Sequence, residues 1–221
     1  MGQRPMPSSL IRNVVWGAIV LGIVVGLLRL TALRWWRVPD DDDDLAASIA
    51  PTLGPGDWVI LWRLTPPGFG DLVLCPDPED ASEVVVARLV GEPGDTVEIA
   101  EDGDLEVNHV RMRSERACKR PSFTVENPRS GEPVELRCDI ETVGGVHHQR
   151  ALMPTTGLRP MPVKVEVEPG DVFLISDNRY HPFDSRDFGA LPQASCSEAV
   201  VFRLVSRLGF AHVDSRLSWI Q

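Results

Sequence analysis

A Gly-Asp pair stands directly before an apolar stretch at four places in this chain of 221 residues. In three of the four turns Pro precedes the Gly. Pro fixes φ at the first turn position and Gly accepts a positive φ at the next, so each unit reverses the chain into a strand. The turns are 54–57, 68–71, 92–95 and 168–171, and the strands expected after them are 58–62, 72–74, 96–99 and 172–175.

Further strand candidates lie elsewhere, at 84–90, 105–107, 163–167 and 199–205. Beyond the N-terminal segment, helix signals are almost absent. Many short strands separated by Gly and Pro turns predict a mainly β fold, a barrel or a sandwich.

The N-terminal segment is long and apolar enough to cross a membrane. Residues 14–33 contain one charge, Arg29, and a spanning helix needs about 20 residues. We expect a tail over 1–12 and a transmembrane anchor over 13–34, with Trp35 and Trp36 in the interfacial belt. A cleavable signal peptide is the alternative, and the lack of a small-x-small site close behind the segment favours the uncleaved anchor.

Charge does not fix the orientation of this anchor. Arg4 and Arg12 on one flank balance Arg29, Arg34 and Arg37 on the other. Five consecutive Asp residues, 40–44, follow within a segment 35–44 that we interpret as a solvated, self-repelling linker. An alternative is that the run repels anionic headgroups or attracts a basic segment of a partner.

The bulk composition excludes several functions. A net charge of −10 argues against nucleic-acid binding, which depends on clustered Lys and Arg. Lysine is scarce, with only Lys119 and Lys164. No metal or cofactor is expected, because there is no C-x-x-C pair and His147-His148 lacks ligand partners at useful spacing.

Residues 113–161 differ from the rest in their Pro, Gly and charge content and weaker strand signals, and are expected to form an inserted cap. The β domain then comprises 45–112 and 162–221. Cys118 and Cys138 lie inside the cap and are the natural disulfide pair in an oxidising compartment. Cys75 and Cys196 remain, and the sequence cannot choose among the three possible connectivities.

Three segments, taken in order, resemble the motifs of type I signal peptidases, which are membrane-anchored Ser/Lys endopeptidases. The first, Ser48-Ile49-Ala50-Pro51-Thr52-Leu53, is similar to S-M-x-P-T-L. The second, from Val86 to Asp95, is similar to the segment K-R-V-x-G-L-P-G-D. The third, from Ser176 to Arg186, is similar to G-D-N-R-x-x-S-x-D-S-R.

The resemblance implies that Ser48 is the nucleophile and that a buried lysine should accept its proton. Ala87 stands where that lysine belongs, Pro182 replaces the serine that orients it, and Ala46 replaces a residue that lends a hydroxyl to the oxyanion hole. The family residues that brace the site are retained as Arg88, Asp177, Asn178, Arg179, Asp184, Ser185 and Arg186.

A substitute base would have to come from elsewhere in the chain. The eukaryotic branch of the family uses histidine, which makes His181 in the third segment the best placed candidate. Lys119 and Lys164 are weaker candidates, the first in the cap and the second before a strand.

Shallow pockets that admit only small side chains are expected near Ile49, Leu53, Val85 and Val86.

Two functional hypotheses follow. One is a signal peptidase I-like endopeptidase in the bacterial inner membrane, its main domain facing the periplasm, that removes signal peptides after small-x-small sites. The other is a catalytically inactive member that binds signal peptides or regulates a true peptidase. Kinship with self-cleaving repressor proteases is a third possibility, but the membrane segment and the lack of a DNA-binding half argue against it. The expected partners are signal peptides of exported proteins and membrane lipid.

Overall fold

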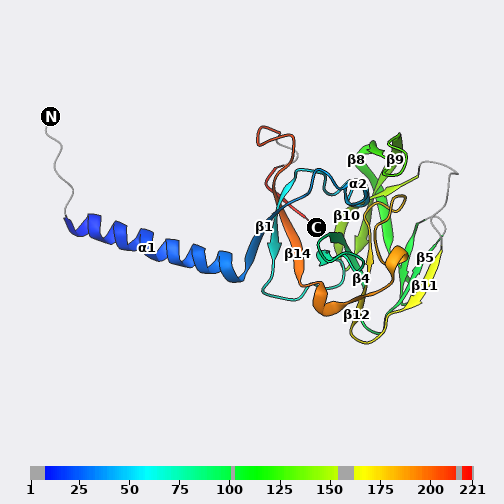
Figure 1. Cartoon of the computed structure of the whole chain (residues 1–221), viewed down its shortest axis with the longest axis horizontal. Helices are drawn as coiled ribbons and strands as arrows, with labels where there is room; N and C mark the ends of the chain where they lie inside the picture. The colour runs from blue at the N-terminus through cyan, green and yellow to red at the C-terminus, as the bar shows by residue number, and fades with distance from the viewer. Residues whose placement is uncertain (1–7, 101–102, 154–161, 213–215, 221) are drawn as a thin grey trace.

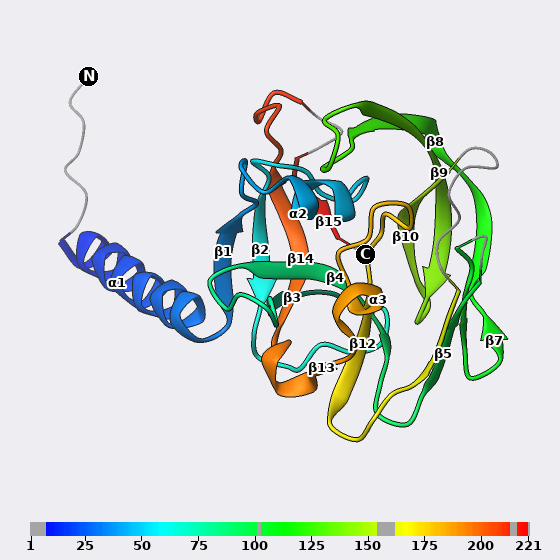
Figure 2. The ribbon, with the colours of Figure 1, turned by 45° about the vertical axis from the view of Figure 1, so that its right-hand side comes forward.

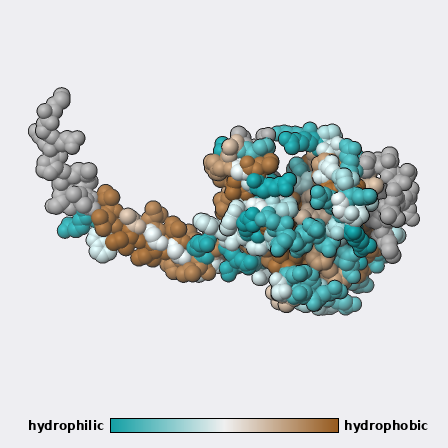
Figure 3. Space-filling view, turned by 45° about the horizontal axis from the view of Figure 1, so that its top comes forward, coloured by the Kyte–Doolittle hydropathy of each residue, from teal (hydrophilic) through white to brown (hydrophobic). Residues whose placement is uncertain are grey.

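Helix α1 (Ser8–Thr31) runs out alone from a β-rich body in the computed structural model, which describes residues 8–100, 103–153, 162–212 and 216–220 (Figure 1). Its 24 residues span about 36 Å, enough to cross a hydrocarbon core of about 30 Å. Its apolar side chains are exposed along the length of the helix (Figure 3). The expected apolar N-terminal helix is confirmed, and of the tail 1–12 only the residues from Ser8 onward are described, already helical.

The helix ends earlier than the expected anchor 13–34. Strand β1 (Leu33–Arg37) begins two residues after Thr31 and pairs antiparallel with β2 (Trp58–Trp62). Arg34 in β1 also forms an ion pair with Glu198, with 2.8 Å between Nη1 and Oε2. Pairing with the body therefore overrides the apolar continuity of the sequence, and Trp35 and Trp36 lie in a strand.

The acidic run is part of the folded body, so the expectation of a free linker over 35–44 is corrected. Val38 is fully buried, and Asp40 forms an ion pair with Arg37. The Asp42 carboxylate caps helix α2 (Asp43–Ser48) by accepting from the backbone N–H of Leu45 at 2.9 Å. A carboxylate at the N-cap accepts a hydrogen bond from a free N–H and is attracted by the positive end of the helix dipole. Both contributions offset the charge repulsion within the run of Asp residues.

The body is built on one eight-stranded sheet, in the order β1-β2-β14-β3-β4-β12-β13, with β15 paired to β14 (Figure 2). The mainly β prediction is confirmed. Its other strands are β14 (Glu198–Val205), β3 (Leu72–Pro76), β4 (Val84–Gly91), β12 (Asp171–Ile175), β13 (Leu191–Pro192) and β15 (Ser218–Trp219). The short helices α3 (Ser185–Phe188) and η1 (Gln193–Ser195) lie between β12 and β14 in the chain.

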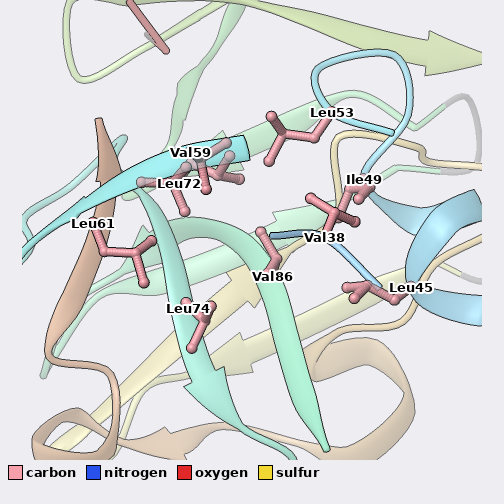
Figure 4. Packing of buried hydrophobic residues seen from close by; sticks show 10 residues of the cluster. Val38, Leu45, Ile49, Leu53, Val59, Leu61, Leu72, Leu74 and Val86 are labelled. Atoms are coloured by element: carbon pink, nitrogen blue, oxygen red, sulfur yellow. The ribbon is translucent and has the colours of Figure 1, made fainter. Parts of the chain in front are cut away.

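Both faces of this sheet are buried, because β3 and β4 are apolar at successive positions and side chains alternate between the faces. Leu72 and Leu74 join one apolar cluster, whereas Val73 and Cys75 join another on the opposite face. Helix α2 covers the first face with Leu45 and Ile49 (Figure 4). This packing fixes the height of α2, and hence of Ser48, above the sheet.

A small sheet extends the body and buries a third apolar cluster. Its strands are β11 (Val163–Glu166), β5 (Thr96–Ile99), β6 (Leu105–Val107) and β7 (Val110–Arg111). The first three of these, with β2, agree closely with the expected ranges.

The cap is more regular than its sequence suggests. It is a three-stranded sheet of β8 (Arg113–Glu126), β9 (Pro133–Val143) and β10 (Val146–Leu152), including the two longest strands described. Charged residues on its solvent side and a register shift between Ala117 and Ser122 dilute the period-2 signal. Residues 154–161 of the expected cap lie outside the described residues.

Two disulfides are present, and no cysteine in the described residues is free. Cys118 and Cys138 join β8 to β9 inside the cap. Cys75 and Cys196 join β3 to the residue after η1 across the second apolar cluster. Each bond thus stabilises one unit, the cap or the body, and the contact between the two units depends on noncovalent packing.

That contact is tightest at the β9–β10 turn. Gly144 and Gly145 both have positive φ, but a Cβ on Gly144 would lie 2.3 Å from the backbone oxygen of Phe69, whereas one on Gly145 would meet nothing within 4 Å. Gly145→Ala should lower the free energy of unfolding by about 1 kcal/mol, the cost of positive φ. Gly144→Ala should lower it by about 2–4 kcal/mol, because overpacking is added.

Urea unfolding of the full chain in detergent measures both changes. Equal losses in the two variants would contradict the close approach of the cap to the 68–71 loop.

Candidate active site

Ser48 is the last residue of α2 and is fully buried. Its Oγ donates a hydrogen bond to the backbone oxygen of Leu45, 3.0 Å away and one turn earlier. In the part of the chain that the structure describes, no hydrogen bond links this hydroxyl to another side chain. The hydroxyl is therefore held by the backbone of its own helix.

Asn178 of the third motif holds the backbone around Ser48. Its backbone N–H donates to the oxygen of Ser48 at 3.0 Å, and its Nδ2 donates to the oxygen of Ala47 at 2.8 Å. Its Oδ1 accepts from the backbone N–H groups of Tyr180 and His181. One buried side chain thus fixes the end of α2 and the loop that carries the third motif relative to each other.

Asp177 joins all three motifs. Arg88 of the second motif donates from Nε and Nη2 to its two oxygens, at 3.0 Å each, and from Nη1 to the oxygen of Gly70 at 2.7 Å. The hydroxyl of Thr52 in the first motif also donates to Asp177. Burial would raise the pKa of Asp177, but the positive charge of Arg88, with His148 and Thr52, brings the pKa below its ordinary value, so the carboxylate is ionised.

The cap supplies a second buried carboxylate to this cluster. Glu141 on β9 accepts from Arg150 Nη1 at 2.7 Å and from Arg179 of the third motif. His148 Nε2 lies 3.2 Å from Glu141 and 3.7 Å from Asp177, without the alignment of a hydrogen bond. Burial would raise the pKa of Glu141, but Arg179, with His148 and Arg150, lowers it to about 2.

The pKa of the imidazole between these carboxylates lies below its ordinary value. Burial lowers the pKa of His148, and the nearby Arg88 lowers it further, against the opposing effect of Asp177 and Glu141. The backbone reinforces the junction, since Ala151 of β10 donates to Asp177 and accepts from Arg179, at 2.8 and 3.0 Å. The cap is therefore bonded directly to the third motif.

Sequence analysis missed Glu141, His148 and Arg150. Glu141 occupies an inward position two residues before the buried Val143, where alternation predicts an apolar side chain. His148 was considered only as a metal ligand, and its exposed neighbour His147 contacts Thr142 instead. No local sequence signal marks the three, because they contact one another across the β9–β10 hairpin and contact Arg179, Asp177 and Asp104 on other segments.

Ala87 lies in an apolar environment. It is fully buried on β4 in the second cluster, with Val85 and Leu89 on the same face of the strand. Phe183, one residue after Pro182, packs against this cluster. The expected environment for a desolvated lysine is therefore present, but a methyl group and an aromatic ring stand in it.

The other two altered positions offer no catalytic group either. Pro182 is half-buried, and Ala46 is half-buried on α2. His181 is half-buried and stacks edge-on against Tyr180, and its Nε2 has no hydrogen-bond partner. Burial, with Arg129, lowers the pKa of His181, while Asp44 opposes this shift. Within the described residues, no hydrogen bond joins His181 to the hydroxyl of Ser48.

The remaining conserved-motif residues stabilise the third motif itself. Asp184 accepts from Arg186 and from the backbone N–H of Ser176 and caps α3, and Ser185 Oγ accepts from the backbone N–H of Leu174. Burial would raise the pKa of Asp184, but Arg186 and these hydrogen bonds lower it. These contacts brace the loop, and none of them supplies a base.

A cleft of about 1470 Å³ lies between α2 and the cap. Ala46, Ala47, Ala50 and Pro51 line one wall, next to Ser48, and β8 with its turn lines the other. Of the expected pocket residues Leu53 lines the cleft, but Ile49, Val85 and Val86 do not, because they are buried in the core clusters.

The two lysines lie on different parts of the molecule. Lys119 is exposed on the β8 wall of the cleft, and Lys164 donates to Glu98 on the small sheet. Glu98, Glu106 and His109 bring their ligand atoms within 4.8 Å of one another there, but the cluster is solvent-exposed and Lys164 already neutralises Glu98.

Comparison with known proteins gives a consistent result. Residues 11–205 match the family described as signal peptidase, peptidase S26. A protein of Synechocystis sp. described as probable signal peptidase I-1 is 24% identical over 216 residues, covering 92% of this chain and 88% of the relative. The crystal structure of a signal peptidase I from Enterococcus faecalis V583 is 25% identical, with a TM-score of 0.36 over 62% of this chain and 97% of that chain.

The charge cluster generates a prediction for Glu141. At neutral pH, Glu141→Gln should lower the free energy of unfolding by about 3–5 kcal/mol, because Arg179 is left buried without its counter-charge and Arg150 keeps only Asp104. In the folded protein the pKa of Glu141 is about 2, below its ordinary value of 4.5. The ionised carboxylate therefore stabilises the fold fully above about pH 4.5, and this stabilisation is lost as the pH falls through 2. The difference between wild type and variant should therefore shrink in that window.

Urea unfolding of the full chain in detergent at several pH values measures this difference. Glu135→Gln, an exposed change in the same hairpin, is the control and should alter stability by less than about 0.5 kcal/mol. A difference for Glu141→Gln that stays constant between pH 7 and 3 would refute the assignment.

Proposed function

The chain belongs to the signal peptidase family, peptidase S26, and we propose that it binds the signal peptides of exported proteins as a member whose Ser/Lys dyad is silent. The observation that carries the proposal is Ala87, fully buried in an apolar cluster at the position of the family's general base. A serine hydroxyl needs a positioned base to become a nucleophile. The hydroxyl of Ser48 instead donates a hydrogen bond to the backbone oxygen of Leu45.

Retention of the scaffold supports a binding role. The contacts of Arg88, Asp177 and Asn178 hold the three motifs in fixed positions relative to one another. The cleft beside Ser48 has a wall of alanines, which suits small side chains on a bound peptide. A protein without the base but with an intact site still presents the surface on which a substrate would lie.

An apolar helix and two disulfides support a membrane-anchored protein in an oxidising compartment. The apolar helix α1 is long enough to anchor the chain. Two disulfides suit an oxidising compartment, which supports a body on the extracytoplasmic side. Signal peptides reach that side as segments tethered to the same membrane.

One observation favours active proteolysis as the second candidate. Burial lowers the pKa of His181, its Nε2 is buried without a hydrogen-bond partner, and the charge of Asp44 at the start of α2 opposes the pKa shift. A rearrangement that freed Ser48 from Leu45 would be required before this imidazole could accept the proton.

A cleavage assay on the full chain in detergent separates the two. Wild type should cleave a small-x-small preprotein no faster than Ser48→Ala. Ala87→Lys with Pro182→Ser should raise the rate at least about 100-fold, since a positioned general base contributes about 10²–10⁴. Ser48→Ala in that background should abolish the gain.

Binding is measured in parallel by fluorescence anisotropy with a labelled signal peptide. Cleavage by wild type that is lost in Ser48→Ala and in His181→Ala would establish the second candidate instead. Failure of wild type to bind the peptide would remove the binding role.

A further inference from the structure

The outer edge of β8 lies along the cleft. A strand that presents a face to a cavity contributes every second residue, because successive side chains point to opposite sides. β9 follows that pattern, with Cys138 and Ile140 on the cleft and Asp139 off it. By contrast β8 and its turn contribute an unbroken run, 123–128, so the strand faces the cleft with its edge.

This edge has no partner strand. The cap sheet has the order β10-β9-β8, which places β8 at its margin among the described residues. Residues 122–126 pair regularly with β9 on one side only, so their remaining backbone N–H and C=O groups point away from it. Unpaired edge groups of this kind are a template for another extended chain.

The free edge is short and bounded at both ends. Toward its start the register with β9 breaks between Ala117 and Ser122, and Pro121 has no N–H to donate. Toward its end the chain turns at Asn127, whose side chain accepts from the N–H of Arg129. A partner strand can therefore pair over about five residues, 122–126.

The opposite wall of the cleft carries small side chains. Ala46 and Ala47 of α2 and Ala50 just after it line this wall, and the next residue after Ala47 is Ser48. The cleft volume of about 1470 Å³ exceeds the 300–1,000 Å³ typical of small-molecule pockets.

We propose that an extended segment of an exported polypeptide, next to its signal-peptide cleavage region, binds this chain by adding a strand to the outer edge of β8. The peptide would run between the cap and the alanines of α2, passing beside Ser48. Main-chain hydrogen bonds to an edge tolerate many sequences, while the alanine wall selects small side chains. This inference rests on the proposed function and assigns the cap to peptide recognition.

The test uses the full chain in detergent and a fluorescein-labelled synthetic signal peptide that ends in a small-x-small site and five further residues. Two derivatives carry N-methyl groups on alternate residues of this last part, one set in each register. Methylation in the pairing register should weaken binding at least about tenfold, because two or three edge hydrogen bonds are lost. The other register should change it by less than about threefold.

A photo-crosslinking amino acid locates the bound segment. It replaces Thr124, which lines the cleft, or Glu135, its exposed register partner on β9, which does not. Crosslinks to the peptide should form from position 124 and be at least about fivefold weaker from 135. Thermal unfolding checks that both variants are folded.

The outcomes separate the two proposals. Binding that neither N-methylated peptide weakens, or equal crosslinking from 124 and 135, would overturn strand addition and leave signal-peptide binding intact. Crosslinks between two copies of the chain from position 124, undiminished by peptide, would assign the edge to self-association and also overturn it. No binding of the parent peptide would remove both proposals.

Discussion

The bidentate pair between Arg88 and Asp177 is the interaction on which the rest of the site depends. It is fully buried, so neither charge can be satisfied by water if the other is removed. Asp177 also accepts from Thr52 of the first motif, and Arg88 donates to Gly70 in the loop that meets the cap. Strand β4, the serine loop, the third motif and the cap therefore converge on one carboxylate.

The pair explains which motif residues are retained and which are not. Arg88, Asp177 and Asn178 each satisfy buried polar groups, so replacing any one of them would leave another unpaired inside the body. Ala46, Ala87 and Pro182 make no such contacts. At these three positions the fold does not require a polar side chain.

The sequence predicted the strands well where one chain segment carries the whole signal. β2, β5 and β6 match the expected ranges because a Gly-Asp turn or a short alternation marks them. The prediction was wrong at β1, where apolar residues that extend the anchor pair with β2 instead. It was also wrong at residues 40–44, where the charge run conceals an N-cap. In both places a partner distant in sequence decides the local structure.

Partners distant in sequence also explain which residues of the site could be predicted and which could not. Similarity to family motifs located Ser48, Arg88 and Asp177, because each lies within a recognisable sequence motif. Glu141 and His148 lie in no such motif, and their role in the buried charge cluster follows only from the residues that the fold brings next to them. Likewise, the expected pocket residues lie within or next to the first two motifs, whereas strand alternation turns Val85 and Val86 toward opposite core clusters.

The identity of residue 87 has an energetic consequence for the fold. A lysine at position 87 would have to lose its charge in the second apolar cluster, and lowering its pKa from about 10.4 to near 7 costs on the order of 4 kcal/mol. Ala87 carries no such cost, and its methyl group lies in the same apolar cluster as Val85 and Leu89. The Ala87→Lys variant is therefore expected to be less stable than the wild type by an amount of this order, because a strained polar group in an apolar site lowers stability.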